Sequence, residues 1–429
     1  MQASSQATVM TFLNEVASEF PEAISFAAGR PTDFLFERLD HEILLKAFVD
    51  YDAYSAKGKI GTASLARLLQ YGRTAGIIND LFVQQIRIDD KVPASVDRVV
   101  ITAGCQEAIV LCLPELCPNS TDVTLVCNPT YIGIAGAAQA TGVALHALAS
   151  TEQDLASAIE ESVVKLRREG RQARALYLIP DFDNPTGRVL DESQRRAILA
   201  VCIRHRIIVL EDNPYGMFRY EGSSIPPLAA LDDAGSVIYL STYSKTLSPA
   251  LRVGAATLPD TLFGDKSARE TLFRALVQRK SFITVNTSQI AQAIVGGLLL
   301  NQQGSLQSWI QPCLARYRDN RDAMLAQLQI TFARWSGTIH WNHPEGGFFL
   351  TLDLPFCVGS QEVIECATNY GVIVMPMSFF AFDRSQDRRI RLAFSSADVT
   401  QIREGVTALG HFVSNKIEPK SHRSSEASR

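Results

Sequence analysis

The stretch STYSKTLSPALRVG, residues 241–254, determines how this sequence can be interpreted. It directly follows an apolar run at residues 237–240, which predicts that Lys245 lies just beyond the carboxyl end of a strand. A lysine amine in such a position can lose its proton on desolvation and then form a Schiff base with an aldehyde. Most lysines are solvated surface charges, so Lys245 alone would be weak evidence.

Three neighbours of Lys245 strengthen this interpretation. Thr242 and Ser244 offer hydroxyl groups, and Arg252 offers a guanidinium group seven residues after the lysine. Such groups suit a single phosphate, because charge-assisted hydrogen bonds are strong and arginine presents a planar fork of donors. The stretch therefore predicts a Schiff-base lysine beside a phosphate site.

Two upstream motifs also follow predicted strands. EDNPYG places Asp212 after the apolar run 207–210, where a carboxylate can keep a pyridine nitrogen protonated, and it puts Tyr215 three residues later. Taken alone, Asp212 could instead be a helix N-cap and Tyr215 a packing residue. PDFDNPTG, residues 180–187, contains a turn that can present the Asn184 amide to a phenolic oxygen.

These three motifs, in this order, resemble those of the class I and II aminotransferases of fold type I, which use pyridoxal 5′-phosphate (PLP). The resemblance covers residues 20–415 and is strongest to the branch that contains aminoadipate and kynurenine aminotransferases. It implies that Lys245 carries PLP as an internal aldimine and that Asp212 pairs with the pyridine nitrogen. Asn184 and Tyr215 would hydrogen-bond the ring hydroxyl. The phosphate would be bound by Thr242, Ser244 and Arg252.

The resemblance also gives roles to two stretches before these motifs. TAGCQEA, residues 102–108, is similar to the family's phosphate-binding turn, where backbone N–H groups at a helix N-terminus face the anion. Tyr131 in NPTYIG matches the aromatic residue that stacks on the pyridine ring, although it could also be a core tyrosine. The residues of the turn that would carry its role are Gly104, Cys105 and Gln106.

Near the C-terminus, RRIRLAFSS contains Arg391, which matches the family arginine that binds the substrate α-carboxylate through a bidentate fork. Its neighbours Arg388 and Arg389 are expected to be solvated charges. The resemblance thus predicts one substrate-binding arginine in a segment far from the cofactor motifs.

The resemblance reaches the N-terminal part of the chain as well. FAAGRPTD, residues 26–33, is similar to the family's substrate-facing loop, in which Gly29 would permit close backbone approach. Arg30 stands where this branch usually has an apolar residue, so it either contacts a polar or acidic substrate side chain or is a surface arginine. Tyr71 in LQYGRTAGI matches the tyrosine that reaches the phosphate of the partner subunit, which implies a homodimer with shared active sites.

Hydrophobic patterning predicts the fold class. Short β-branched runs alternate with helical stretches from residue 99 to 258, which is typical of an α/β domain with a mostly parallel sheet. A long helix from residue 305, a hairpin-like strand pair in HPEGGFFLTLDL and a final helix over residues 399–412 predict a smaller α+β domain.

With the resemblance, this pattern implies a fold type I transferase whose large domain has a mostly parallel seven-stranded sheet. An N-terminal arm that packs with the small domain would precede the large PLP-binding domain, and the polar C-terminus would be a disordered tail. The expected divisions are 1–45 for the arm, 46–300 for the large domain, 301–415 for the small domain and 416–429 for the tail.

Composition excludes several other classes of protein. The 429 residues carry a formal charge of −4 and no long basic run, so a small molecule is a better partner than nucleic acid. The eight cysteines form no CxxC pair and no zinc-site spacing with histidine, which predicts reduced thiols and no metal. No segment resembles a signal peptide or a membrane span, so we expect a cytoplasmic protein.

We therefore predict an aminotransferase that moves an amino group from an L-amino acid to a 2-oxoacid through the Lys245 aldimine and pyridoxamine phosphate. Another PLP reaction is an alternative, such as decarboxylation, C–S lysis or oxidation, because a fold does not dictate a reaction. A ligand-sensing domain of a transcription regulator is a second alternative, but residues 1–25 are too few for a winged helix. The sequence leaves the amino donor and the acceptor open.

Overall fold

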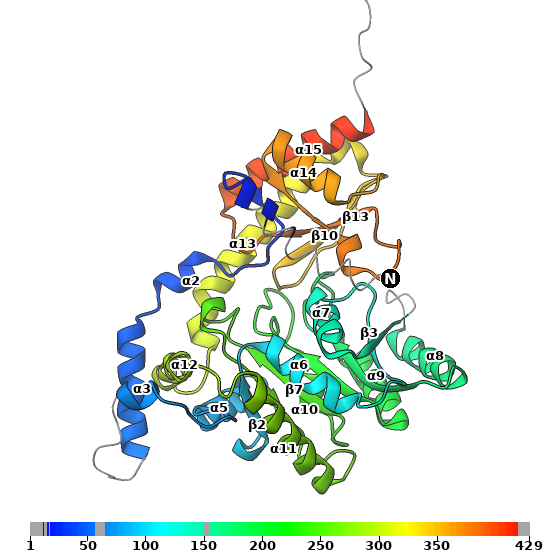
Figure 1. Cartoon of the computed structure of the whole chain (residues 1–429). Coiled ribbons are helices and arrows are strands. Elements are labelled where there is room, and N and C mark those ends of the chain that lie inside the picture. The colour runs from blue at the N-terminus through cyan, green and yellow to red at the C-terminus, as the bar shows by residue number, and fades with distance from the viewer. Residues whose placement is uncertain (1–11, 13–14, 17, 56–64, 149–153, 419–429) are drawn as a thin grey trace, which may run out of the picture.

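A computed structural model describes residues 18–55, 65–148 and 154–418, together with residues 12, 15 and 16 near the N-terminus. Figure 1 shows two parts, a larger one and a smaller one above it. The larger part is built around a seven-stranded sheet. The cavity that contains the predicted functional residues lies where these two parts meet.

The large sheet has the strand order β2-β8-β7-β6-β5-β3-β4. Its strands are parallel except β8, which pairs antiparallel with both of its neighbours. Parallel strands connected by helices place their carboxyl ends at one edge of the sheet, which is where ligands bind in open α/β sheets. The strands are β2 (Val99–Thr102), β3 (Asp122–Val126), β4 (Ala144–Ala147), β5 (Gln172–Leu178), β6 (Ile208–Asp212), β7 (Val237–Thr242) and β8 (Gly254–Thr257).

Helices cover both faces of this sheet (Figure 1). Helix α9 (Glu192–His205) begins at a capping box in which Asp191 accepts from the backbone of Gln194 and the Gln194 side chain accepts from Asp191. The other helices around the sheet are α4 (Leu65–Leu68), α5 (Asn79–Asp89), α6 (Cys105–Leu116), α7 (Ile132–Thr141), α8 (Leu155–Arg168), α10 (Leu228–Leu231), α11 (Lys266–Ile283) and α12 (Gln289–Asn301).

The runs that the sequence predicts as strands, residues 99–102, 123–127, 175–179, 207–210, 237–241 and 253–258, all form strands, and their ends differ from these bounds by up to three residues. Strand β4 was not predicted, because its sequence ALHA has little β-branched character and is only half-buried. It lies at one edge of the sheet, where burial imposes a weaker pattern on the sequence.

The smaller part has a four-stranded antiparallel sheet with the order β12-β13-β10-β9. The prediction of two strands within HPEGGFFLTLDL is wrong: this stretch contains only β10, which pairs with β9 on one side and β13 on the other. The HPEGG residues connect β9 to β10. The elements are β9 (His340–Trp341), β10 (Phe349–Asp353), β12 (Met375–Pro376), β13 (Arg389–Ala393), α14 (Ser360–Tyr370) and α15 (Val399–Ile417).

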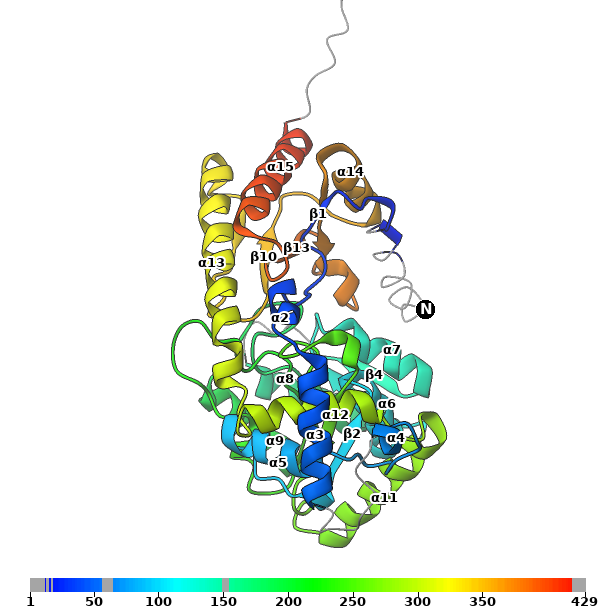
Figure 2. The same cartoon turned by 90° about the vertical axis from the view of Figure 1, so that its left-hand side faces the viewer.

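Helix α13 (Gln307–Thr331) joins the two parts and runs along one side of both in Figure 2. Trp309 and Tyr317 near its start belong to the core of the large part, whereas Met324 and Leu328 belong to the core of the small part. The helix therefore fixes the position of the small sheet relative to the large one.

The N-terminal segment contacts both parts. Strand β1 (Ile24–Ser25) pairs with β11 (Val372–Ile373) of the small part. After α2 (Asp33–Glu37), helix α3 (His41–Ser55) instead packs on α12 of the large part (Figure 2). Residue 45, where the arm was expected to end, therefore lies inside helix α3 and not between two elements.

The expected C-terminal tail lies almost wholly outside the described residues. Helix α15 continues to Ile417, so the first two residues of the expected tail, 416 and 417, are helical instead. Residues 419–429 are not described.

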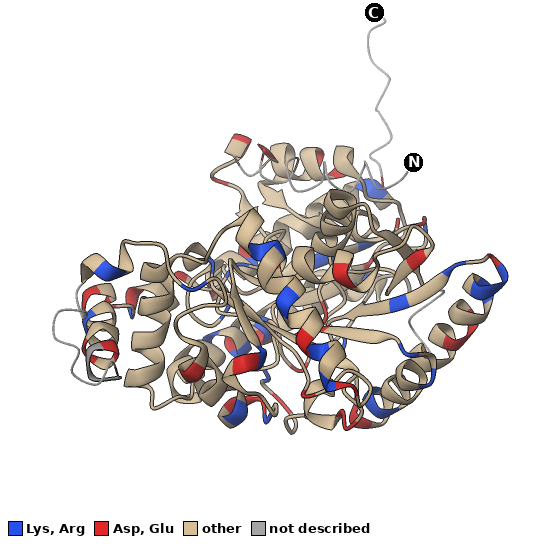
Figure 3. Ribbon diagram, turned by 60° about the horizontal axis from the view of Figure 1, so that its bottom comes forward, with Lys and Arg blue, Asp and Glu red and all other residues tan. Residues whose placement is uncertain are grey.

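The described residues contain neither a membrane-spanning helix nor a cluster of metal ligands. No helix there is long and apolar enough to cross a bilayer. No group of His, Cys, Asp and Glu in the same residues could hold a metal ion, and all eight cysteines are free. Figure 3 shows basic and acidic residues intermixed on the outer helices. Cytoplasmic residence stays a prediction.

Candidate active site

A cavity of about 610 Å³ opens between the carboxyl edge of the large sheet and the small part. This volume is in the range of sites that bind small molecules and cofactors. Its lining includes nearly every site residue predicted from the sequence. The predicted residues that line it are Gly29, Arg30, Cys105, Gln106, Tyr131, Asn184, Asp212, Tyr215, Thr242, Ser244, Lys245, Arg252 and Arg391.

Lys245 lies three residues beyond the end of β7, as the sequence predicted. Its Nζ atom donates to the carbonyl of Gly29, at 2.9 Å, which links the large part to the N-terminal segment. Burial and the nearby positive charges of Arg391 and Arg252 lower the pKa of Lys245 to about 8. About a tenth of this amine is therefore unprotonated, and nucleophilic, at pH 7, far more than for an exposed lysine.

Asp212 is the last residue of β6 and is buried. It accepts the Tyr177 hydroxyl on Oδ2 at 2.7 Å and the Cys105 thiol on Oδ1 at 3.1 Å. Burial raises the pKa of the Asp212 carboxyl, and these two hydrogen bonds act in the opposite direction. Asp212 is thus a strand-end carboxylate with two donors, and its side chain has no helix-capping role among these contacts.

Tyr177 was not singled out by the sequence analysis. It is the second-last residue of strand β5, in the apolar half of that strand, and is fully buried. A tyrosine within the apolar run ALYLI, residues 175–179, indicates that a polar group lies nearby, because a buried tyrosine hydroxyl usually has a hydrogen-bond partner. The sequence does not indicate that this partner is Asp212.

Arg391, on the central strand β13 of the small sheet, reaches across the cavity to Asn184. Its Nη1 donates to Asn184 Oδ1 at 2.5 Å, and its Nη2 donates to the carbonyl of Ala27. The buried Nε atom has no partner among the described residues. Burial lowers the pKa of Arg391 to about 10. The guanidinium carbon lies 4.2 Å from the ring centre of Phe349 and 4.9 Å from that of Phe380. Aromatic rings therefore surround the cation on this side of the cavity.

Since Asn184 uses its oxygen to accept from Arg391, its amide N–H₂ is left for another acceptor. Tyr215 is buried, and its ring packs edge-on against Phe348 and Phe349. Burial raises the pKa of the Tyr215 hydroxyl far above its usual value, so the group stays a donor.

Hydroxyl and guanidinium groups converge after β7. Thr242 Oγ1 lies 3.0 Å from Ser244 Oγ, and Arg252 Nη1 donates to Ser244 Oγ at 3.2 Å. Arg252 Nη2 also donates to the carbonyl of Ala103 in the turn before α6, at 3.3 Å. The predicted phosphate-binding residues of two distant segments are therefore in contact.

The turn before α6 requires a glycine. Gly104 has φ +76° and is the N-cap of α6, and a Cβ atom there would lie 2.3 Å from Arg252 Nη2. No side chain caps this helix start. The backbone N–H groups of its first turn, from Cys105 and Gln106, are consequently without a side-chain acceptor.

The side chains of Cys105 and Gln106 make other contacts, while the prediction for these two residues concerns their backbone N–H groups. The Cys105 side chain contacts Asp212, and the Gln106 side chain donates to the carbonyl of Gly133 at 2.8 Å. Tyr131 begins α7, and its ring lies against Gly133, where a Cβ atom would be 2.2 Å away. Burial and the charge of Asp212 raise the pKa of Tyr131 to about 12.

The remaining predicted residues lie at the edge of the cavity or away from it. Arg30 is exposed at the cavity, and its guanidinium makes no hydrogen bond or ion pair among the described residues. Tyr71 is 84% exposed and does not line the cavity. Arg388 is exposed as expected, but Arg389 is not a solvated charge, because it forms an ion pair with Asp353 on β10.

Comparison with known proteins identifies the family of this chain. The family model "Aminotransferase class I and II" matches residues 81–409. The (S)-3,5-dihydroxyphenylglycine transaminase of Amycolatopsis orientalis is 36% identical over 95% of this chain and 92% of its own length. The mitochondrial kynurenine/alpha-aminoadipate aminotransferase of Bos taurus is 25% identical over 93% of this chain and 94% of its own.

A solved structure supports the same assignment. The kynurenine aminotransferase of Pyrococcus horikoshii, in complex with pyridoxamine phosphate, is 28% identical and superposes with a TM-score of 0.79, covering 96% of this chain and 95% of that one. The aminoadipate and kynurenine branch, the fold type and the cofactor predicted from the sequence are confirmed. The chain belongs to the PLP-dependent aminotransferases of class I and II.

Proposed function

We propose that this aminotransferase takes its amino group from an aromatic L-amino acid. The observation that carries the proposal is the apolar wall of the cavity around the buried cation Arg391, which suits a carboxylate attached to a large apolar side chain. Two relatives have names that refer to aromatic substrates, dihydroxyphenylglycine and kynurenine. The large apolar residues that the N-terminal segment and the small part contribute to this wall are Phe20, Phe349, Ile373, Met375 and Phe380.

The residues of the site fit PLP. A phosphate would be held by Thr242, Ser244, Arg252 and the first-turn N–H groups of α6, where Gly104 leaves room that a Cβ atom would take from Arg252. Tyr131 would stack on the ring. When bound, PLP supplies an electrophilic aldehyde and a ring that withdraws electrons from the substrate.

Lys245 would attach the cofactor and move protons. Its pKa of about 8 and the Gly29 carbonyl 2.9 Å from Nζ support this role, because the amine is both reactive and held in place. Once an amino acid has displaced it, the freed Nζ would take the proton from the substrate Cα as a general base.

Asp212 would hold a proton on the pyridine nitrogen. Its position at the end of β6 and the two donors on its carboxylate support this role, because a fixed anion there stabilises a cationic ring. The amide of Asn184 and the hydroxyl of Tyr215 would donate to the ring oxygen from the other side.

Arg391 would bind the substrate α-carboxylate. Support comes from its unpartnered Nε atom and from its anchoring by Asn184 and the Ala27 carbonyl, which together orient the guanidinium. Because Asn184 touches Arg391 as well as facing the cofactor site, it would align the substrate with the cofactor.

We also propose that the enzyme is a homodimer in which Tyr71 reaches the phosphate site of the partner. The support is an exposed apolar surface around Tyr71 that a second copy would cover. Asn286 and Gln289, which follow α11, hydrogen-bond the backbone of residues 70 and 72, so the segments of this surface are adjacent. Its large apolar residues are Leu65, Leu69, Tyr71, Phe282, Ile283 and Val285.

Mixed dimers test the role of Tyr71 in the partner's site. Tyr71→Ala and Lys245→Ala chains, refolded together, would give dimers in which one site keeps both groups and the other keeps neither. We expect activity to reappear in the mixture. If mass spectrometry confirms mixed dimers but their activity equals the sum of the two separate variants, Tyr71 acts within its own chain or has no role.

Single-turnover reactions test the substrate class. The PLP enzyme is mixed with each amino acid, and conversion to pyridoxamine phosphate is followed by absorption. We expect kcat/KM to be highest for aromatic donors, and 2-oxoglutarate to restore the starting spectrum. Fastest conversion of small or acidic donors would refute the aromatic assignment, and products other than oxoacids would favour a different PLP reaction. Binding without any turnover would favour the ligand-sensing alternative.

A further inference from the structure

A buried ion pair lies directly behind the turn that precedes α6. Glu107, in the first turn of α6, accepts from Lys280 Nζ on α11 at 2.8 Å and from the Thr284 hydroxyl at 2.6 Å. The same carboxylate accepts the backbone N–H of Ala103, at 2.5 Å. One carboxylate thus accepts from a neighbouring backbone N–H group and from two side chains that lie more than 170 residues later in the sequence.

Both charges of this pair are removed from water, with side-chain exposures of 0% for Lys280 and 7% for Glu107. Burial lowers the pKa of Lys280, which shows that its environment disfavours a charge. Buried ion pairs contribute little net stability, because desolvation offsets the attraction between the charges. Stability alone is therefore a weak explanation for this pair.

The pair holds one side of the turn, and Arg252 holds the other. The N–H of Ala103 donates to Glu107, and the carbonyl of the same residue accepts from Arg252 at 3.3 Å. The next residue, Gly104, is the N-cap that presents the first-turn N–H groups of α6. A change at Glu107 would consequently reach both the N–H groups and the guanidinium.

We propose that Glu107 and Lys280 are positioning residues for the cofactor phosphate, which fix the Ala103–Gly104 turn between α11 and Arg252. The inference rests on the phosphate-binding role proposed above for this turn. Lys280 also neutralises Glu107, which would otherwise place an unpaired carboxylate one helical turn from a dianion. The pair acts on the phosphate end of the cofactor and not on its ring.

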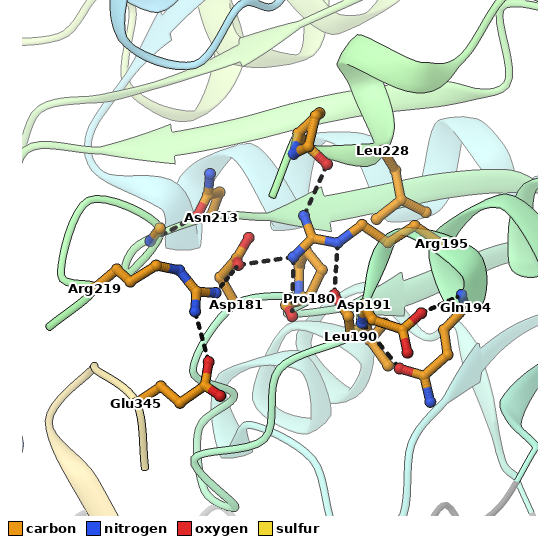
Figure 4. Close-up of polar contacts among 12 residues, drawn as sticks. Pro180, Asp181, Leu190, Asp191, Gln194, Arg195, Asn213, Arg219, Leu228 and Glu345 are labelled. Atoms are coloured by element: carbon orange, nitrogen blue, oxygen red, sulfur yellow. Dashed lines mark hydrogen bonds and ion pairs between the residues drawn. The ribbon is translucent and has the colours of Figure 1, made fainter. Parts of the chain in front are cut away.

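A matched ion pair elsewhere in the molecule provides a control. Asp181 and Arg195 are separated by 2.7 Å and have the same side-chain exposures, 7% and 0%. Figure 4 shows Asp181 between Arg195 on α9 and Arg219, with Arg219 continuing to Glu345. Neutralising this pair tests what the loss of a buried pair does in general.

The experiment compares PLP with pyridoxal, which lacks the phosphate. Cofactor-free protein is titrated with each ligand, and dissociation constants are read from the visible absorption of the Lys245 adduct. For the double variant Glu107→Gln with Lys280→Met, we expect PLP to bind about tenfold more weakly and pyridoxal to change by less than about twofold. Lys280→Met alone should weaken PLP further, since it leaves Glu107 unpaired.

The double variant Asp181→Asn with Arg195→Met should leave the ratio of the two dissociation constants unchanged. If the Glu107 and Lys280 variants do not fold, the variants Thr284→Val and Thr284→Ser test the proposal instead. Both keep the ion pair, but only serine keeps the hydroxyl group that donates to Glu107. Valine should lower the preference for PLP over pyridoxal, and serine should restore it.

Equal weakening of both ligands, or an unchanged preference in every variant, would overturn the proposal. Failure of the underlying phosphate site gives a different result, in which the unaltered protein does not prefer PLP and Arg252→Ala changes nothing.

Discussion

The two walls of the cavity are built in different ways. The wall formed by the large sheet consists of polar side chains from short motifs at strand ends, such as Asp212 after β6 and Lys245 after β7. The opposite wall, from the N-terminal segment and the small sheet, is mainly apolar and has Arg391 at its centre. Arg391 is held by contacts to residues 207 and 364 positions away in sequence. The residues of the polar wall therefore come from short motifs that each follow a strand, whereas Arg391 is placed by contacts between the small sheet and distant segments.

The largest effect is expected for Lys245→Ala on the polar wall. Loss of the amine removes both cofactor attachment and the proposed general base, and a general base alone contributes about 10²- to 10⁴-fold. Single-turnover rates with an aromatic donor should fall by at least this factor. Added methylamine should restore part of the rate, because a small amine can enter the space left by the side chain. No loss, or reduction by borohydride that labels another lysine, would refute the assignment.

Arg391→Gln tests the apolar wall. Hydrogen bonds to a charged group contribute about 1.5–3 kcal/mol, so kcat/KM for amino-acid donors should fall about 10- to 150-fold. The absorption of bound PLP should not change, since the proposed partner is the substrate carboxylate. Arg388→Gln is the control, because this neighbouring arginine is exposed. A loss of PLP in the Arg391 variant would mean that the two walls are not separable.

This contrast also explains what the sequence predicted well. Strand-end motifs such as those of Asn184, Asp212 and Lys245 combine a periodic pattern with fixed short spacing, so both the sheet and the polar residues at its edge could be predicted. The strand count in HPEGGFFLTLDL was wrong, because two adjacent glycines before an apolar run suggest a hairpin turn between two strands. In the structure these glycines, Gly346 and Gly347, lie in the connection between β9 and β10, where they pack closely against Phe182 of the large part.

Contacts between distant segments were missed for a physical reason. Tyr177 bonds Asp212 across two neighbouring strands, and Lys280 reaches Glu107 from a helix 173 residues later. Neither pair has a spacing that marks it in the sequence. The ion pair of Arg389 with Asp353 was mistaken for a solvated charge, because only the register of β10 against β13 places these residues side by side.

The pH dependence of cofactor capture sharpens the account of the polar wall. The pKa of Lys245 is lowered from 10.5 to about 8, so the folded protein loses this proton more easily than an exposed lysine does. Only the unprotonated amine attacks an aldehyde. The rate at which cofactor-free protein captures pyridoxal should therefore rise with a midpoint near pH 8 and fall about tenfold per unit below it. A midpoint near 10.5 would mean that the amine is solvated.

The smallest effect is expected for Arg30→Leu, at the edge of the apolar wall. Its guanidinium is exposed and has no partner among the described residues, so an interaction with a substrate would be largely screened by water and contribute about 0–1 kcal/mol. For a donor with a side-chain carboxylate, such as glutamate or 2-aminoadipate, kcat/KM should fall by up to about fivefold.

For phenylalanine the Arg30→Leu variant should match the unaltered enzyme or exceed it, because leucine extends the apolar surface. Arg388→Leu serves as the control for a general effect of removing one positive charge. The informative quantity is the ratio of acidic to aromatic donors in the same preparation. If that ratio is the same in all three proteins, Arg30 is a surface arginine and the apolar wall alone selects the substrate.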